Sequence, residues 1–427
     1  MNDAVLSHRD IDALGARAET MITELGEISA EPGRLVRLFL SKEHRRAADV
    51  VGSWMRAAGM AVTEDALGTV RGRWCDPDER TGARRLLVGS HIDTVIDAGK
   101  YDGPLGVVAG ILAVDRLSRR RRRFAFGIDV LAFGDEEGSR FPSNLSTSAA
   151  VAGKFDPATL ALADRDGISY GTALAAYGKN ADDIATVAYS RDEAAAYVEV
   201  HIEQGPTLEA RGEPLGVVSG IIGQNKMQVT VEGEAGHAGT VPMELRRDAL
   251  AGAAELVLAI ERIARDDAVD RMVATVGRIE VLPGATNIIP GRVTFTVDLR
   301  AESNDRRRDA MASIKAQAWE IVETRGLQIT FDPYHESTTT PCAPELRKLL
   351  ATSIAGLGHR PFELPSGAGH DAQMMAHLCP SAMMFVRCRD GISHNPNEFA
   401  SPRDMGLAIA ALIGFIERFD PDRLEAP

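Results

Sequence analysis

The sequence predicts an α/β protein with a mostly parallel sheet and an inserted α+β domain of ferredoxin-like plan. A chain of 427 residues exceeds what one ordinary hydrophobic core holds, so two or more domains are expected. Apolar strands alternate with helical segments towards both ends of the chain, which is typical of a parallel sheet covered on both faces. Near Leu215 the pattern changes to alternating, half-buried strands.

The first part of the chain alternates helices with strands. Helical periodicity covers residues 11–25 and 47–58, and Gly59 follows the second helix, where a glycine commonly ends one. The next expected elements are strands at 61–64 and 85–90, a helix at 105–117, and strands at 128–133 and 196–201. These elements predict a first domain over residues 1–214.

The middle of the chain follows the order β-α-β-β-α-β, which is the ferredoxin-like plan. The expected elements are a strand at 226–232, a helix at 247–265, strands at 271–281 and 293–300, a helix at 308–325 and a strand at 327–331. We therefore predict an inserted domain over residues 215–333. Residues 334–427 return to helices and strands and are expected to complete the first domain.

Charge and composition exclude several classes of partner. The net charge of −13 disfavours nonspecific binding to nucleic acid or to an anionic membrane surface. Five consecutive arginines at 119–123 are an exception to this negative charge. We interpret them as a solvated turn between a helix and a strand. No signal-like segment or run of 18 apolar residues is evident, so a cytoplasmic location is expected. The scattered cysteines are expected to be reduced and mostly buried: Cys75, Cys342, Cys379 and Cys388.

Several polar clusters stand where the loops of an open α/β sheet gather ligand-binding groups. His91 and Asp93 follow an apolar strand and project to the same side, which suits a metal-bound imidazole held by a carboxylate. A buried core histidine is the alternative. Asp102 lies among glycines before a helix, where it could be only an N-cap, although glycines also admit a carboxylate to a crowded site.

Three further clusters complete a mixed nitrogen and oxygen donor set. Three acids at 135–137 leave an apolar strand, His201 ends another strand, and His394 closely follows a third. Such donors suit Zn²⁺, Mn²⁺ or a related divalent ion. Five ligands are too many for one tetrahedral ion, whereas one bridging aspartate can hold two ions roughly 3.5–4 Å apart. One glutamate of the adjacent pair would then remain free to carry protons.

The motifs GSHIDT, YDGPLGV, DEEGSRF, HIEQG and ISHNP, in this order, resemble a known family. They are similar to those of the amidase/hydantoinase/carbamoylase branch of the M20 metallopeptidase-like enzymes, over about residues 11–415. The resemblance implies a di-metal hydrolase domain with two divalent ions, Zn or Mn with Co also possible. It assigns Asp102 as the bridge, Glu136 as the general base and Asp93 to the catalytic group. The implied metal ligands are His91, Asp102, Glu137, His201 and His394.

The resemblance also implies roles for the inserted domain as a lid and as the contact of a homodimer. His237 would reach into the neighbouring subunit to stabilise an oxyanion and contact substrate. Arg300 would clamp a substrate carboxylate through two hydrogen bonds, with Asn287 and Gln204 around it. The implied substrate-binding residues are Gln204, Gln224, His237, Asn287, Arg300 and Gly369. His370 belongs to the motif of Gly369, whereas five histidines match no motif and are expected to be structural or exposed: His8, His44, His335, His359 and His377.

Two positions depart from the family pattern. Thr147 stands where glycine is common, and Val241 stands where threonine is common. We expect metal binding to be unaffected and the shape of the pocket to differ.

Finer resemblance at residues 92–103 and 384–394 favours an allantoate amidohydrolase, which converts allantoate to ureidoglycine, ammonia and CO₂. An N-carbamoyl-L-amino acid hydrolase or a β-ureidopropionase is the alternative, and a dipeptidase of the wider superfamily fits less well. A metal-free binding protein that kept only the fold is a hypothesis of a different class.

Overall fold

The computed structural model describes residues 6–119, 123–266 and 272–424, and the chain forms two compact units. The large unit comprises Met1–Ser219 and Cys342–Pro427, and the small unit is Gly220–Pro341. The insert therefore begins and ends later than the predicted 215–333. Strand β6 (Leu215–Ile221) pairs with β16 (Ser381–Val386) of the large unit, and β13 (Gln328–Ser337) continues beyond residue 333.

The large unit is built on a sheet whose strands run in the order β1-β2-β4-β3-β5-β16-β6. The four central strands are parallel and fully buried, whereas the outer pairings are antiparallel. The expectation of a mostly parallel sheet is thus confirmed. The central strands are β4 (Ile128–Phe133), β3 (Arg85–His91), β5 (Ala194–Ile202) and β16. The outer ones include β1 (Ala61–Glu64), β2 (Val70–Trp74), which the sequence analysis missed, and β15 (Glu363–Ser366).

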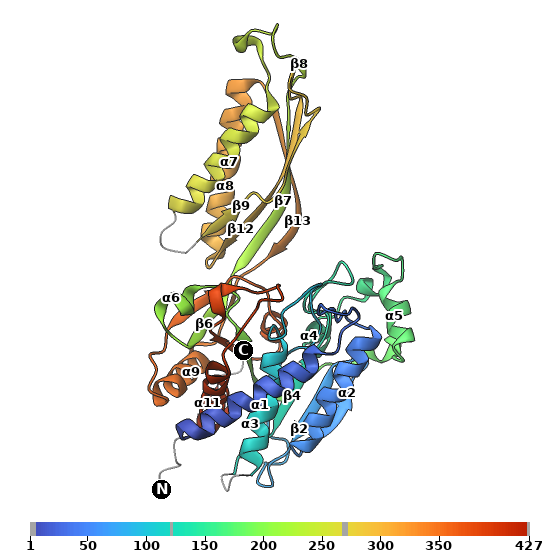
Figure 1. The fold of residues 1–427 in the computed structure, drawn as a ribbon, viewed down its shortest axis with the longest axis vertical. Helices are drawn as coiled ribbons and strands as arrows, with labels where there is room; N and C mark the ends of the chain where they lie inside the picture. Colours follow the sequence, from blue (N-terminus) through green and yellow to red (C-terminus); the bar gives the residue numbers. More distant parts are fainter. Residues whose placement is uncertain (1–5, 120–122, 267–271, 425–427) are drawn as a thin grey trace. The chain divides into compact units, whose positions relative to one another are not determined.

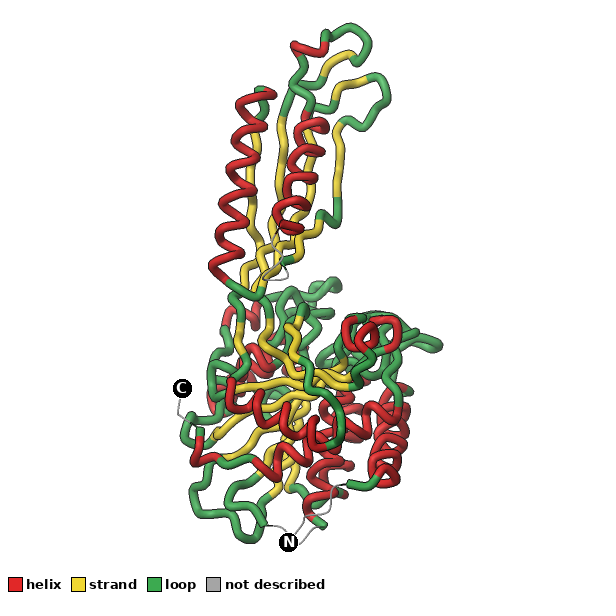
Figure 2. Tube along the Cα trace, turned by 90° about the vertical axis from the view of Figure 1, so that its left-hand side faces the viewer, coloured by secondary structure: helices red, strands yellow, loops and turns green. Residues whose placement is uncertain are grey.

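Helices cover this sheet because its central strands are apolar on both faces. α1, α3, α9 and α11 pack together as one layer, and α2 lies against β1 and β2 (Figure 1, Figure 2). Gly15 and Gly406 permit a close crossing of α1 and α11, since a Cβ on Gly15 would lie 1.8 Å from the Pro402 carbonyl oxygen. The helices of the large unit are α1 (His8–Gly26), α2 (Lys42–Ala57), α3 (Pro104–Ser118), α4 (Ser146–Val151), α5 (Tyr170–Ala176), α6 (Thr207–Arg211), α9 (Pro344–Gly356), α10 (Ala372–Met375) and α11 (Pro402–Arg418).

The small unit has the predicted ferredoxin-like order. Its antiparallel sheet runs β10-β12-β7-β13, with β9 also beside β12, and α7 and α8 pack on it. Alternate residues of β12, such as Phe295 and Leu299, face the helices and form the core with Leu256 and Ile314. The elements are β7 (Gly223–Glu232), α7 (Ala249–Asp266), β9 (Val273–Thr275), β10 (Ile279–Leu282), β12 (Arg292–Ala301), α8 (Asn304–Arg325) and β13.

The single strand expected at 271–281 is wrong in one respect, and residue 271 itself lies outside the described residues. Two strands, β9 and β10, pair with β12 in registers that differ by one residue: Thr275 opposes Asp298, and Ile279 opposes Phe295. The extra residue interrupts the ladder as a bulge does.

A separate two-stranded ladder, formed by β8 (Gly236–His237) and β11 (Ile288–Ile289), lies beyond one end of the main sheet of the small unit (Figure 1). It follows the end at which Arg292 opposes Glu232. At the other end, Arg300 opposes Gln224. The small unit therefore carries expected functional residues at both ends of its long strands.

Four further expectations concern the cysteines, the arginine run, membrane-spanning helices and the histidines without a motif. The four cysteines are free and only Cys75 is exposed, as predicted. The arginine run falls mostly on residues 120–122, which lie outside the described residues. Across the described ranges, no helix combines the length and apolar character that a membrane crossing needs. Of the histidines without a motif, His44 is fully buried and bonded to the Tyr177 hydroxyl at 2.9 Å.

Candidate metal centre

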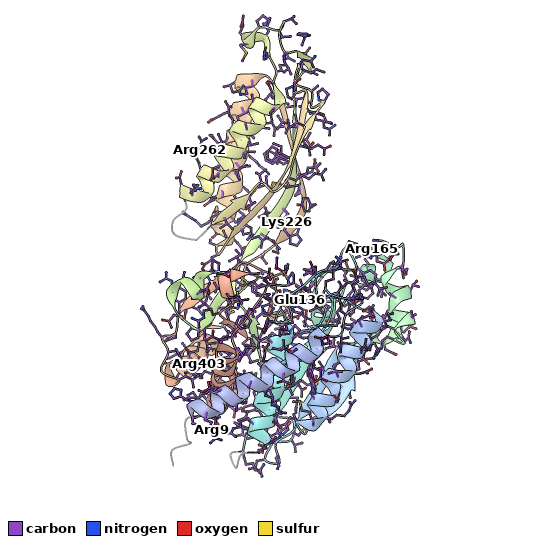
Figure 3. The ribbon with its side chains drawn as sticks, in the orientation of Figure 1. Arg9, Glu136, Arg165, Lys226, Arg262 and Arg403 are labelled. Atoms are coloured by element: carbon purple, nitrogen blue, oxygen red, sulfur yellow. The ribbon has the colours of Figure 1, made fainter. Side chains whose placement is uncertain are left out.

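The five expected metal ligands come together at the carboxyl ends of the parallel strands in the large unit. This is where an open α/β sheet places its ligand-binding loops. The same loops carry Glu136, which is labelled in Figure 3. His91 ends β3, Asp102 precedes α3, Glu137 follows β4, His201 lies near the end of β5, and His394 follows β16.

Asp102 is the centre of this cluster. Its Oδ1 lies 3.1 Å from Nε2 of His201 and 3.6 Å from Nε2 of His91. Its Oδ2 lies 3.3 Å from Nε2 of His394, which is itself 3.5 Å from the Glu137 carboxylate. The two oxygens thus face two different donor groups, as a bridging ligand requires.

The residues fit a pair of divalent ions. One possible ligand group is His91, Asp102 and His201, and another is Asp102, Glu137 and His394. Nε2 of His91, Nε2 of His201 and Oε1 of Glu137 are buried without a hydrogen-bond partner. Buried polar atoms are rarely left unsatisfied, so these atoms are oriented for a ligand that accepts their lone pairs.

Electrostatics favour a cation at the same place. Burial disfavours charge on His91, but Asp102, Asp93 and Glu136 outweigh it, and the pKa of its imidazole lies well above the usual value. Asp102 raises the pKa of His394 to about 9. Carboxylates that attract protons to imidazoles in this way would also attract a divalent ion.

The two glutamates of the acidic loop differ in their contacts. Burial, with Asp102 adding to it, raises the pKa of Glu137 to about 7, and its carboxylate faces His394. Burial likewise raises the pKa of Glu136 well above its usual value, while Oε2 of Glu136 lies 3.9 Å from Nε2 of His91. Glu136 is therefore near the cluster without belonging to either of the two ligand groups.

Asp93 connects the first histidine to the acidic loop. Nδ1 of His91 lies 3.1 Å from the backbone carbonyl oxygen of Asp93 and 3.5 Å from Oδ1 of its carboxylate, the pairing expected from the His-x-Asp spacing. The same carboxylate accepts the backbone N–H groups of Glu136 and Glu137 at 3.3 and 3.4 Å. Asp93 therefore orients a ligand and the loop that carries the other acids.

Thr147 contacts the backbone just before this loop. Its side chain is fully buried, accepts the Gly134 N–H at 3.1 Å and donates to the Gly134 carbonyl at 2.6 Å. The departure from the family pattern at this position therefore acts on the backbone that precedes the acidic loop.

Asp135, Gln204 and His394 all have positive φ angles of 53–58°. Left-handed non-glycine residues cost of order 1–3 kcal/mol each and cluster at functional sites.

Two expected substrate residues lie beside the metal cluster. The Gln204 amide donates to Oδ2 of Asp102 at 2.8 Å and is 3.5 Å from Nε2 of His394. Gly369 precedes His370, whose ring packs edge-on against His201 with centroids 4.4 Å apart. Both residues are therefore close to the proposed ligands.

Arg300 has an internal partner in the small unit. Its guanidinium donates to both carboxylate oxygens of Asp298, two residues earlier on β12, at 3.0 and 2.6 Å. Opposite it, the Gln224 amide is 3.0 Å from Nε2 of His335, a histidine that matched no motif. A substrate carboxylate would have to share or displace the Asp298 contact.

Asn287 is not beside Arg300 of the same chain, which corrects our expectation. Ala238 donates its N–H to the Asn287 carbonyl, and His237 opposes Ile288, so Asn287 belongs to the exposed His237 end. From Arg292 to Arg300 β12 advances by eight residue steps, which separate the two ends by roughly 27 Å, at about 3.4 Å per residue.

The sequence analysis assigned no role to two buried glutamates, Glu199 and Glu398. Glu199 accepts hydrogen bonds from Ser90, Tyr197 and the Ala372 backbone, and it lies two residues before His201. That spacing places both side chains on one face of β5 and could have signalled it. Glu398 contacts the loop of Asp102, and only the folded chain shows this contact.

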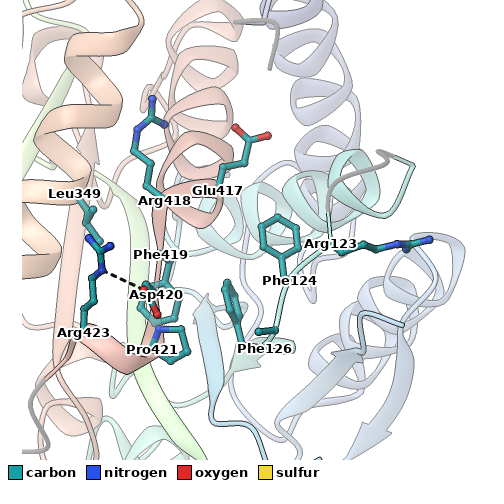
Figure 4. A pocket seen from close by; sticks show the side chains of 11 residues that line it. Arg123, Phe124, Phe126, Leu349, Glu417, Arg418, Phe419, Asp420, Pro421 and Arg423 are labelled. Atoms are coloured by element: carbon teal, nitrogen blue, oxygen red, sulfur yellow. Dashed lines mark ion pairs between the residues drawn. The ribbon is translucent and has the colours of Figure 1, made fainter. Parts of the chain in front are cut away.

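Two cavities of the large unit lie apart from the cluster. One, of about 570 Å³, is lined by Phe124, Phe126, Arg418 and neighbouring residues (Figure 4). The other, of about 270 Å³, is lined by Leu38, Ile96 and Arg140 among others. No predicted site residue lines either cavity, so the cluster is identified by its chemistry.

The chain matches a known protein family over most of its length. The model of Peptidase family M20/M25/M40 matches residues 87–418. The chain belongs to this family. The chain is 40% identical to an allantoate deiminase from Arabidopsis thaliana over 429 residues, covering 94% of this chain and 81% of the relative. It is also 40% identical to an N-carbamoyl-L-amino acid amidohydrolase from Geobacillus stearothermophilus over 401 residues, covering 93% of this chain and 97% of the relative.

A solved relative supports the same grouping. A hydantoinase/carbamoylase family amidase from Burkholderia multivorans matches with a TM-score of 0.88 and 33% identity, over 95% of this chain and 97% of that one. The family resemblance of the sequence motifs is therefore confirmed, and the chain is a hydrolase.

Proposed function

We propose that the chain is a two-metal amidohydrolase that cleaves a carbamoyl or ureido C–N bond of a small carboxylate. Allantoate is the first candidate, with ureidoglycine, ammonia and CO₂ as products. The observation that carries the proposal is the Asp102 carboxylate, whose two oxygens face separate donor groups. Relatives named as allantoate deiminase and carbamoyl amino acid amidohydrolase support the amidohydrolase activity.

In this proposal His91 and His201 would hold one ion, Glu137 and His394 would hold the other, and Asp102 would supply a carboxylate oxygen to each. When bound, such ions polarise a carbonyl and make water more acidic. Asp93 orients the imidazole of His91 and the backbone of the acidic loop. Glu136 takes a proton from the attacking water at its buried carboxylate and delivers it to the departing nitrogen.

Recognition of the substrate carboxylate is assigned to Arg300 with Gln224, and Gln204 and Gly369 would contact the remainder of the substrate. A planar guanidinium pairs well with a carboxylate, and its present bonds to Asp298 illustrate that two-point geometry. His237 would stabilise the developing oxyanion, with Asn287 beside it. Because these two residues lie at the far end of β12 from Arg300, one active site needs a second copy of the chain. This separation supports a homodimer through the small unit.

The second candidate function is that of an N-carbamoyl-L-amino acid hydrolase or a β-ureidopropionase. The bacterial carbamoyl amino acid hydrolase is as similar to this chain as the plant allantoate deiminase, at 40% identity. The same metal cluster and carboxylate clamp would serve either substrate. Only the group attached to the ureido nitrogen differs, so turnover has to separate them.

Removing the metal ions should abolish hydrolysis, and Zn²⁺, Mn²⁺ or Co²⁺ should restore it, because the donors are imidazoles and carboxylates. The measurement is ammonia release from allantoate and from N-carbamoyl-L-amino acids, side by side, before and after dialysis against a chelator. Faster turnover of the carbamoyl amino acids would favour the second function. Full turnover by metal-free protein would contradict the metal mechanism.

Glu136→Gln should keep the metal ions and lose turnover by ~10²–10⁴-fold, the usual loss when a general acid/base is removed. Metal content by elemental analysis and kcat are both measured. Glu137→Gln is the matched comparison and should lower metal content, because Glu137 belongs to a ligand group. If Glu136→Gln lost metal instead, the roles of the two glutamates would be reversed.

Mixing two inactive variants, Glu136→Gln and His237→Ala, should restore activity. A hybrid dimer has one site with an intact Glu136 and a His237 from the other subunit, so random exchange should recover roughly a quarter of wild-type turnover. Mixing Glu136→Gln with the double variant is the control and should give no recovery. Absence of rescue despite demonstrated subunit exchange would argue that His237 does not act across the dimer.

Arg300→Ala should lower kcat/KM by about ten to a few hundred-fold, because charge-assisted bonds contribute ~1.5–3 kcal/mol each. The variant should also lose discrimination between the acid and its amide, while Arg300→Lys should rescue only in part. Arg265→Ala, on the helical side of the same unit, is the control and should leave kcat/KM unchanged. Equal losses on charged and neutral substrates would mean that Arg300 supports the fold.

A further inference from the structure

Glu398 is a buried glutamate that belongs to neither ligand group, yet it contacts the loops of two proposed ligands. Its side chain accepts the backbone N–H groups of Tyr101 and Asp102 at 2.9 and 3.1 Å through one oxygen. Its other oxygen accepts the Ser393 hydroxyl at 2.9 Å. We propose that Glu398 is a positioning residue that sets the placement of Asp102 against His394 and thereby the affinity for metal. This inference rests on the proposed metal centre.

The contact network is short and continuous. Ser393 directly precedes His394 in the chain, and its hydroxyl also lies 2.8 Å from Oδ2 of Asp102. One glutamate and one serine thus connect the bridging carboxylate with the neighbour of a ligand from a distant part of the chain. Tyr101 and Glu398 are 297 residues apart in the sequence.

Packing leaves Glu398 little freedom. Only 5% of the residue is exposed, and its backbone N–H donates to the Asn395 carbonyl at 3.0 Å. On the opposite side, a Cβ on Gly99 would lie 2.3 Å from the Glu398 carboxyl carbon. Glycine at position 99 therefore lets the loop of Asp102 come into direct contact with this carboxylate.

His394 has particular need of such support. Its side chain is 51% exposed, whereas those of His91 and His201 are 1% exposed, and its backbone has a positive φ of 53°. Packing alone does not hold a half-exposed side chain on a strained loop. The hydrogen bond that the Ser393 hydroxyl donates to Glu398 provides this constraint. Comparable residues behind metal ligands typically change metal affinity by ~10–100-fold when removed.

A purely structural clamp is the alternative, and the chain contains one for comparison. Asp65 accepts the backbone N–H groups of Leu67 and Thr69 at 2.9 and 3.0 Å in the turn between β1 and β2. It makes the same kind of contact without touching a proposed ligand. Because Asp65 also accepts the Arg71 guanidinium at 2.9 Å, Asp65→Ala reports the loss of a loop clamp together with that ion pair, away from the proposed ligands.

The experiment measures Zn²⁺ affinity of chelator-stripped full-length protein, by competition with a chromophoric chelator, and the melting temperature of the same metal-free samples. Glu398→Ala should bind Zn²⁺ ~10–100-fold more weakly. Glu398→Gln should stay close to wild type, because its amide oxygen can accept both N–H groups and its NH₂ can donate to Ser393. Asp65→Ala should melt lower with unchanged affinity.

Each result distinguishes a positioning role of Glu398 from a purely structural one. Wild-type affinity in Glu398→Ala, an equal loss in Glu398→Gln, or an equal loss in Asp65→Ala would overturn the positioning role. If Glu398→Ala does not fold, Ser393→Ala decides: weaker Zn²⁺ binding without a lower metal-free melting temperature supports the role, and unchanged binding overturns it. Failure of the wild type to bind Zn²⁺, Mn²⁺ or Co²⁺ would instead reject the proposed metal centre.

Discussion

Three imidazole rings converge on one buried carboxylate, that of Asp102, and the rest of the large unit is arranged around this convergence. The two oxygens of Asp102 face different partners, so a shift of its loop would disturb both groups. Three imidazoles outweigh burial and hold the pKa of its carboxyl well below the usual range. A charge can be buried at this depth only where such partners surround it.

The parallel sheet is what makes this arrangement possible. β3, β4, β5 and β16 run in the same direction, so the loops that leave them meet at one edge. Each loop is then fixed by buried hydrogen bonds: Asp93 holds the acidic loop, Thr147 holds Gly134, and Glu398 holds the loop of Asp102. The left-handed residues of the site are strained, and these bonds offset part of that cost.

The small unit follows a different principle. Its sheet buries one face against α7 and α8, and the other face carries polar side chains such as Gln224 and Arg300. Long strands separate this polar group from the exposed His237 at the opposite end. If residues at both ends serve one reaction, as proposed above, the length of the strands would require them to come from two chains.

The amino-acid sequence alone identifies the apolar strands and the polar residues that follow them. It therefore predicted the parallel sheet, the ferredoxin-like order, and the candidate ligands from His91 to His394, because these properties depend on local periodicity and on motif order. That Asn287 lies away from Arg300, and that Glu398 accepts the Tyr101 N–H, is evident only in the folded chain. Such contacts depend on strand register and loop packing between residues far apart in the chain, and no local pattern encodes them.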